Sequence, residues 1–439
     1  MTLAYCACRM PGPSGDLRRQ KGLPMIGNQR VTVIAAALLL GFASVLAQSQ
    51  QVSPQFGSSH SPKPPGGGGH SGPPAPVFGA PLSGLTSAQL ADFADGLGDF
   101  QEVDTPDTGL GPIFNNTSCV ACHSVPAPGG GSAIFETRFG QLVNGVFDPL
   151  AALGGSLLQQ FAIDPAAQEF IPSAANVFAK RLTTPLFGAG LIEAIPDATI
   201  LGYAALPKPD GIVGRAAMVV DVTTGETRVG RFGWKAQQAT LLAFAGDAYL
   251  NEIGITNRFF PQENAPNGDQ ALLQQFDTVA DPEDAIDPST GKADIDHFAD
   301  FMRMLAPPPP KPLSKSAVAG AVLFLSVGCA TCHLPVMVTG PSTIAALDHK
   351  LVPLYSDLLL HNMGSLGDGI GQAAAMPSEM KTPPLWGLHV RGPYLHDGRA
   401  ATVDAAILQH DGEAATVRNR YSALPSVLKQ QLLAFLGSL

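Results

Sequence analysis

The sequence contains few cysteines and leaves none for a structural disulfide. Six of the 439 residues are Cys, and four of them lie in two short motifs. The other two, Cys6 and Cys8, lie in an N-terminal segment that we expect to be removed. A scaffold held together by disulfides is therefore excluded. The chain is nevertheless long enough for two ordinary domains, each with a core of its own.

Basic residues are outnumbered by acidic ones. The chain has 26 Lys and Arg against 36 Asp and Glu, a formal net charge of −10. Residues 1–47 hold five basic residues and one acidic residue. The remainder of the chain therefore has 21 basic and 35 acidic residues, a net charge of −14. Such a surface disfavours nucleic acid as a partner. It suits a small redox protein with a basic surface, although a soluble protein without such a partner has the same composition.

The N-terminal segment lacks the length of a membrane span and has the pattern of an export signal. Arg30 precedes an apolar run over residues 31–46, and Val45-Leu46-Ala47 offers a small-residue cleavage site. A membrane-spanning helix needs about 20 apolar residues. We therefore expect a signal peptide over residues 1–47, with Met1 or Met25 as the start, and a mature periplasmic protein without an integral membrane span. An uncleaved anchor is the alternative.

Two short motifs of identical form stand out from this composition. Residues 119–123 read CVACH and residues 329–333 read CATCH, and C-x-x-C-H is the attachment pattern of c-type haem. Two thiols on one helical turn add to the two vinyl groups of the porphyrin, and the following His binds the iron. A redox disulfide or half of a zinc site needs no His after both pairs. We therefore predict two covalently bound haem c groups, held by Cys119, Cys122, Cys329 and Cys332, with His123 and His333 as iron ligands.

Segments rich in Pro and Gly divide the chain. Residues 48–80 predict a disordered tether, and prolines at positions 307–310 mark a second boundary. We expect an N-terminal haem c domain over residues 81–306 and a C-terminal cytochrome c domain over residues 307–439. Helical periodicity dominates, and alternation around residues 213–232 predicts one β-hairpin. The predicted fold is mainly α, with two cytochrome c-type haem domains, long loops and a small β-hairpin.

The supply of second axial ligands differs between the two halves. Between His70 and His297 the only His is His123 and the only Met is Met218. The first iron is therefore either open or capped by a weak or distant group. The second half has five His besides His333, and several Met. Two strong ligands give an electron relay and an open position gives substrate access, so we interpret the first haem as the reactive centre.

The motifs carry a resemblance to a known family. The chain resembles dihaem oxidoreductases, often called thiol oxidoreductases, that are related to bacterial dihaem cytochrome c peroxidases, to MauG and more distantly to haem rubber oxygenases. The similar stretches, in order, are GLGPIFNNTSCVACH at 109–123, RLTTPLFGAGLIEAIP at 181–196, GRFGWKAQ at 230–237, YSDLLLHNMG at 355–364, TPPLWGL at 382–388, PYLHDGRA at 393–400 and AILQHDGEA at 406–414. The resemblance implies a peroxidase-like oxidoreductase. Thiol chemistry has no support, because every mature Cys belongs to a haem motif.

The resemblance also implies site residues. An axial ligand of the second haem is expected fourteen residues after His396, at His410, with Met363 as the alternative. Residues 230–235 are expected near the distal side of the first haem. Their lining side chains would be Phe232, Trp234 and Lys235, and Trp234 or Trp386 is a candidate electron-hopping station or simply a packing residue. The peroxidases bind calcium partly through backbone oxygens near a stretch like 393–398, so calcium is a further candidate cofactor.

One position departs from the pattern of the relatives. The peroxidases carry a distal Glu that acts as a general acid–base, and the count from Trp234 gives Leu242 instead. Arg231 or Lys235 would then stabilise charge on the leaving oxygen. Three functions stay open. The first is reduction of hydrogen peroxide, or a related oxidant, at the first haem with electrons delivered through the second. The others are electron transfer alone and an oxygenase or protein-modifying oxidase of the rubber-oxygenase or MauG type.

Overall fold

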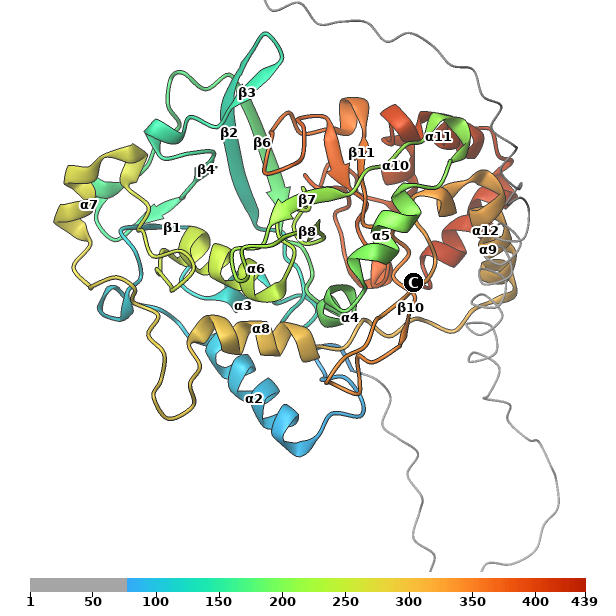
Figure 1. Ribbon diagram of the computed structural model, residues 1–439. Helices are drawn as coiled ribbons and strands as arrows, with labels where there is room; N and C mark the ends of the chain where they lie inside the picture. The colour runs from blue at the N-terminus through green and yellow to red at the C-terminus, as the bar shows by residue number, and fades with distance from the viewer. Residues whose placement is uncertain (1–76) are drawn as a thin grey trace, which may run out of the picture.

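The computed structural model describes residues 77–439 (Figure 1). The predicted signal peptide over residues 1–47 and most of the predicted tether over residues 48–80 lie outside the described residues, so both stay predictions. Within the described part of the chain, no helix is long and apolar enough to cross a membrane.

A pair of packed helices supports the first cysteine motif. Helix α2 (Ser87–Gln101) lies against α8 (Asp294–Met304), as Figure 1 shows. Gly96 makes this close approach possible, because a Cβ there would stand 2.3 Å from a backbone oxygen of α8. Aromatic rings fill the rest of the contact, with the centroids of Phe100 and Phe301 4.8 Å apart. The N-terminal segment is thereby fixed to a helix about 200 residues later in the chain.

The fold has more β-structure than the sequence analysis predicted. The expected hairpin is formed by β7 (Ala217–Val220) and β8 (Thr227–Gly230). An antiparallel four-stranded sheet was not expected, because its strands are short or lack regular apolar alternation. It consists of β2 (Phe135–Val143) with β3 (Val146–Asp148), β4 (Leu157–Leu158) and β6 (Val177–Leu182). Three further antiparallel pairs are β1 (Ile113–Phe114) with β5 (Phe161–Ala162), β9 (Met337–Val338) with β10 (Leu351–Val352), and β11 (Leu360–Asn362) with β12 (Glu379–Lys381).

The second cysteine motif follows a helix that is held by the C-terminal helix. Helix α9 (Lys315–Val327) crosses α12 (Ser426–Leu436), and a Cβ at Gly320 would stand 1.9 Å from a backbone oxygen of α12. The rings of Phe324 and Phe435 lie 5.4 Å apart at this crossing. The remaining α-helices are α3 (Cys119–Cys122), α4 (Ala189–Glu193), α5 (Asp197–Ala204), α6 (Leu241–Ala248), α7 (Gln270–Phe276), α10 (Val403–Leu408) and α11 (Ala415–Ser422).

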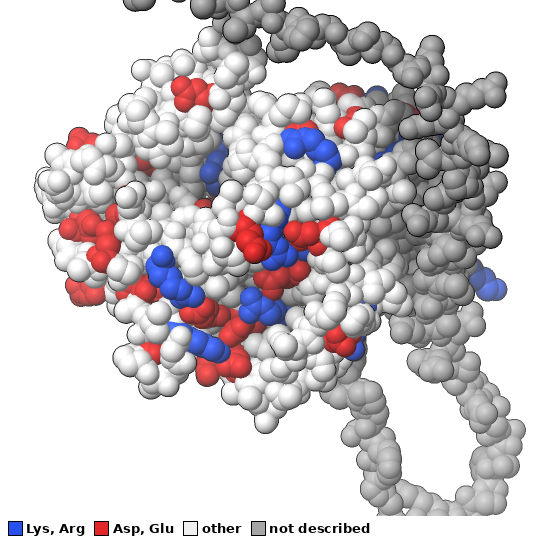
Figure 2. All heavy atoms as spheres, viewed as in Figure 1, with Lys and Arg blue, Asp and Glu red and all other residues white. Residues whose placement is uncertain are grey.

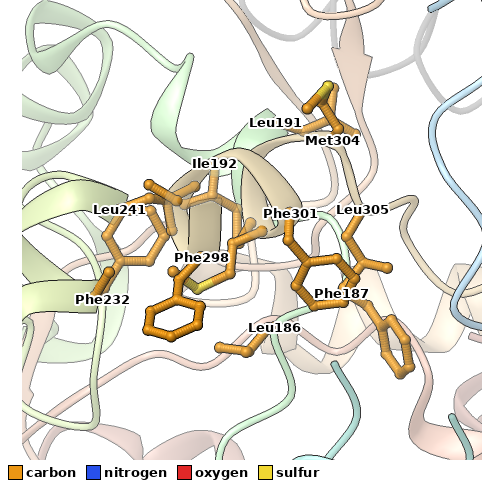
Figure 3. Close-up of a cluster of buried hydrophobic side chains, with 14 of the residues drawn as sticks. Leu186, Phe187, Leu191, Ile192, Phe232, Leu241, Phe298, Phe301, Met304 and Leu305 are labelled. Carbon is orange, nitrogen blue, oxygen red and sulfur yellow. The ribbon is translucent and has the colours of Figure 1, made fainter. Parts of the chain in front are cut away.

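The larger hydrophobic core lies where α4, α6 and α8 meet. Figure 3 shows part of it, including Phe232, Leu241 and Phe298. The same cluster of buried side chains contains Met337 and Leu354, which follow the proline-rich segment at 307–310. Side chains from both sides of that predicted boundary therefore share one core. A second, smaller core surrounds α9, α11 and α12.

The charged residues on the visible face are mixed in sign. Figure 2 shows acidic and basic side chains close together near the centre of this face. Ion pairs between side chains of opposite charge are common in this fold, for example Arg303 Nε 2.7 Å from Glu193 and Lys292 Nζ 2.6 Å from Asp92. The excess of acidic residues is therefore not gathered into one acidic patch on the face shown.

Two histidine-lined pockets as the candidate active site

The first motif opens into a cavity of about 170 Å³. Cys119 and Cys122 stand at the two ends of the helical turn α3, and positions three apart on a helix share one face. The ring of His123 is fixed by a hydrogen bond in which Nδ1 donates to the carbonyl oxygen of Gly130 at 3.1 Å. Burial lowers the pKa of His123 to about 4, so the ring is neutral at pH 7. Its Nε2 atom is then free to bind a metal.

The wall near the His123 ring is apolar and comes from the packed helices. Phe100 of α2 lies 6.0 Å from the His123 ring, and Phe298 and Met302 of α8 line the same cavity. Among the residues that line this cavity, Met302 is the only Met and His123 is the only His. The sequence analysis had considered Met218, which lies on β7, is 44% exposed and does not line the cavity.

Three carboxylates also line this smaller cavity. They are Glu136 on β2, Asp247 on α6 and Glu252 on the π-helical turn η5 (Tyr249–Ile253). Burial, followed by the charge of Glu136, raises the pKa of Glu252 to about 7, and Asn115 Nδ2 donates to its Oε2 at 2.8 Å. Burial also raises the pKa of Asp247. The cavity therefore contains a carboxyl group suited to exchange protons near neutral pH.

The absence of an acid at position 242 does not leave the smaller cavity without one. Leu242 lies on α6 but is not among the residues lining the cavity, whereas Phe244, Ala245 and Ala248 are. At about 100° per residue, position 242 lies about 200° around the helix from position 244. Counting along the sequence from Trp234 thus pointed to the wrong side of α6. The acid of α6 that lines the cavity is Asp247, which lies three residues after Phe244 on the same helix.

The second motif opens into a larger cavity of about 450 Å³, and four histidines line it: His333, His361, His396 and His410. His333 Nδ1 donates to the carbonyl oxygen of Tyr355 at 3.1 Å, and His410 Nδ1 donates to that of Ala406 at 2.9 Å. The two ring centroids are 6.4 Å apart. Two imidazoles that share one metal ion through bonds of about 2 Å place their centroids about 6 Å apart. Met363, the alternative ligand, also lines this cavity.

The two cavities are separated by a wall that they share. Trp234 is the largest side chain of this wall, and its Nε1 donates to the carbonyl oxygen of Leu182 at 2.8 Å. Its ring meets that of His396 edge-on at 6.2 Å. Trp386 lines the larger cavity only. The residues that line both cavities are Leu182, Thr183, Thr184, Leu186, Gly233, Trp234 and Phe244.

Three of the four residues predicted on the distal side of the first haem lie elsewhere. Phe232 and Arg231 line the larger cavity, and Lys235 lines neither. Arg231 is buried against Asp197. Lys235 is fully buried, with Nζ 2.8 Å from Asp368 and donating to the carbonyl oxygen of Glu379 at 2.5 Å. The expectation that either cation stabilises charge at the first haem is therefore corrected, because internal carboxylates already neutralise both.

Another histidine of the second half is committed to a charged cluster. His361 is buried, with Nε2 2.9 Å from Asp357 and Nδ1 2.8 Å from Glu413. Hydrogen bonds to these carboxylates raise its pKa to about 12 despite burial. It is therefore held as a cation between two anions, and neither ring nitrogen is free for a metal. The structure is silent on calcium, which stays a prediction.

These residues fit a haem in each cavity. Each cavity has two unpaired Cys and a neutral His whose Nε2 is free, and the larger cavity has a second such His. A planar, mostly apolar group fits walls of this kind. Covalent attachment of the haems to the cysteines stays a prediction.

Comparisons with solved structures give distant likenesses. Hydrazine synthase of Kuenenia stuttgartiensis is 15% identical with a TM-score of 0.39, covering 88% of this chain and 100% of that chain. A MauG-like protein associated with microbial copper homeostasis is 17% identical with a TM-score of 0.28, covering 58% and 89%. A variant of the diheme peroxidase BthA from Burkholderia thailandensis is 14% identical with a TM-score of 0.37, covering 82% and 87%. Likenesses this distant carry no argument about activity.

Sequence comparison places the chain in a family. No curated protein matches it. The family described as "Di-haem oxidoreductase, putative peroxidase" matches residues 173–439, which is more than half of the chain and includes the second motif, His396 and His410. The protein therefore belongs to this family of peroxidase-like oxidoreductases with two haems.

Proposed function

We propose that the protein is a periplasmic dihaem c-type oxidoreductase that reduces hydrogen peroxide, or a related small oxidant, in the smaller cavity. Electrons enter through the larger cavity from a small redox protein. The observation that carries this proposal is the difference between the two cavities. The smaller has a single His with three carboxylates, and the larger has two His whose rings lie 6.4 Å apart.

The difference in ligands assigns a role to each cavity. A haem in the larger cavity would be held by His333 and His410, and two strong ligands of this kind suit electron transfer. A haem in the smaller cavity would be held by His123, the one His among its lining residues, and could then bind an oxidant. When bound, the two haems supply the redox chemistry. Reduction of one peroxide molecule to two waters consumes two electrons from the donor protein and two protons.

The residues of the smaller cavity handle the protons of this reaction. The Glu252 carboxylate accepts a proton at Oε2 and returns it to the departing oxygen, which a group with a pKa of about 7 can do in both directions. Asn115 orients that carboxylate through its hydrogen bond. Arg138 and Arg181 lower the pKa of Glu136, which therefore stays ionised beside Glu252. The neighbouring charge keeps Glu252 a weak acid.

The shared wall supports passage of electrons between the cavities. Trp234 lines both cavities. Its indole is held by the hydrogen bond to the carbonyl oxygen of Leu182 and by edge-on packing against the His396 ring. A rigid aromatic ring between two redox groups shortens each electron-transfer step. Periplasmic location rests on the export-signal pattern of residues 1–47.

The test is a spectrum combined with a turnover assay on the purified holoprotein. EPR of the oxidised protein should show one high-spin and one low-spin haem. The protein should oxidise a reduced small cytochrome when hydrogen peroxide is added. Two low-spin haems together with no peroxide-dependent turnover would refute the proposal.

One observation favours a second function, electron transfer alone. Met302 is buried and lines the smaller cavity beside His123. A thioether bound to the first iron would give two six-coordinate haems. Substituting Met302→Leu separates the two functions. It converts a low-spin signal to high-spin if Met302 is a ligand, and it leaves the spectrum unchanged if the position is open.

A further inference from the structure

The larger cavity is lined by cations and by no carboxylate. Four Lys and Arg side chains line it, besides His361 with its two carboxylate partners, and none of its described lining residues is Asp or Glu. The smaller cavity, in contrast, is lined by three carboxylates. Burying a cation away from water costs several kcal/mol unless an anion or a set of oxygen atoms compensates. Each of the four cations therefore needs a partner.

Two of the four cations have internal partners. Arg231 pairs with Asp197, and Arg418 NH1 lies 3.3 Å from Asp411 and donates to the carbonyl oxygen of His410 at 2.8 Å. These two side chains are part of the protein scaffold. They leave no charge to attract a ligand.

The other two cations, Lys381 and Arg391, have no anionic partner among the described residues. Lys381 is 7% exposed, and no described carboxylate lies within 4.0 Å of its Nζ. The charge of Asp357 acts on Lys381 and raises its pKa, but this carboxylate is bound to His361 at 2.9 Å. Arg391 makes one hydrogen bond, from NH2 to the carbonyl oxygen of Pro384 at 2.7 Å. Both cations thus line the cavity without an ion-pair partner among the described residues.

Lys235 shows how this chain treats a buried lysine that has only a structural role. Its Nζ pairs with Asp368 at 2.8 Å and is surrounded by three backbone carbonyl oxygens. Lys381 lies on the same part of the fold, where its N–H donates to the carbonyl oxygen of Trp234 at 3.0 Å. The side chain of Lys381 has neither a paired carboxylate nor such carbonyl oxygens among its hydrogen-bond partners in the described residues. Burial, together with the charge of Arg391 in the lining of the same cavity, lowers the pKa of Lys381 to about 8.

We propose that Lys381 and Arg391 form a binding site for a pair of carboxylates or a similar oxyanion at the edge of the larger cavity. Two sources share this chemistry. They are the propionates of the haem held at Cys329 and Cys332, and a diffusible anion such as phosphate. Either ligand supplies a negative charge to the buried Lys381 and the half-buried Arg391. The proposal rests on haem binding in this cavity, which the proposed function also requires, but not on peroxide reduction.

The proposal predicts an effect on the redox potential of the low-spin haem. A positive charge near an iron favours the reduced state, so its removal lowers the potential. In the holoprotein, Lys381→Met should reduce the equilibrium constant for reduction of this haem about tenfold, which corresponds to about 59 mV for one electron. Lys381→Arg keeps the charge and should restore the potential. Lys350→Met removes an exposed lysine and is the matched control.

The experiment is a spectroelectrochemical titration with and without inorganic phosphate. If the propionates occupy the site, phosphate leaves the potential of the wild-type protein unchanged while Lys381→Met lowers it. If a diffusible anion occupies the site, phosphate shifts the wild-type potential, and Lys381→Met abolishes that shift. Arg391→Met gives the same measurement should Lys381→Met fail to retain haem. Potentials of both variants equal to that of Lys350→Met, with no phosphate effect, would overturn the proposal. A protein without peroxidase activity can still pass this test.

Discussion

The imidazole rings of His333 and His410 lie with their centroids 6.4 Å apart in the larger cavity, although 76 residues separate them in the chain. The C-terminal end of α10 presents His410, and the turn after α9 presents His333. Each ring is oriented by a hydrogen bond from Nδ1 to a backbone carbonyl oxygen. This pair explains why the larger cavity suits electron transfer better than substrate binding.

Substitution of His410 should open the coordination of the second haem. In His410→Gly, the imidazole opposite His333 is lost, so the low-spin signal of one haem should become high-spin in the EPR spectrum. Met363→Leu is the matched control, because Met363 lines the same cavity and should leave the spectrum unchanged. If Met363→Leu gives the high-spin signal and His410→Gly does not, the ligand is Met363.

Substitution of Glu252 should impair proton transfer. Loss of a general acid–base typically costs about 10²–10⁴-fold, and we expect Glu252→Gln to lower kcat/KM for peroxide within that range. Because the ionised carboxylate starts the reaction, wild-type kcat/KM should rise with pH through the pKa of about 7. The variant should lose this step. Leu242→Glu is the control, since a carboxylate there faces away from the cavity, and rescue of Glu252→Gln by it would contradict this assignment.

Trp234 and Trp386 should differ in their effect on electron transfer between the haems. Trp234 lines both cavities and Trp386 only the larger. We expect Trp234→Phe to slow transfer from the second haem to the first by roughly tenfold, about 1.4 kcal/mol in barrier height. Trp386→Phe should leave the rate nearly unchanged. Stopped-flow absorbance after mixing the reduced protein with peroxide measures both rates, and equal rates in the two variants would rule out a special role for Trp234.

Substitution of Asp368 should destabilise the fold. Its side chain is fully buried and pairs with Arg181 at 2.7 Å and with Lys235 at 2.8 Å. Asp368→Asn leaves Lys235 without a carboxylate and Arg181 with only Glu136, at 3.5 Å. Removal of one partner of a buried ion pair typically costs about 3–5 kcal/mol. Asp397→Asn removes a partner of the half-exposed Arg399 and should cost less than about 1 kcal/mol. Circular dichroism during denaturant unfolding compares them, and similar losses would show that burial of the Asp368 pair is unimportant.

The local features of this protein could be predicted from its sequence. The C-x-x-C-H motifs at positions 119–123 and 329–333 depend on spacing within one turn, so the prediction of haem c there needs no tertiary contact. The hairpin of β7 and β8 is equally local. The position of His410 also followed from the sequence, through its distance from the HDG motif of residues 396–398 and the likeness to known relatives.

Tertiary structure alone decided which side chains meet inside the cavities. Glu136 and Glu252 line one cavity although more than a hundred residues separate them, because β2 and the end of α6 converge beside His123. Lys235 and Lys381 are the same residue type and are both buried, yet only Lys235 forms an ion pair with Asp368. Burial and pairing of charges depend on contacts between distant segments. The sequence determined where the two haem motifs stand, and packing determined that one cavity is acidic and the other basic.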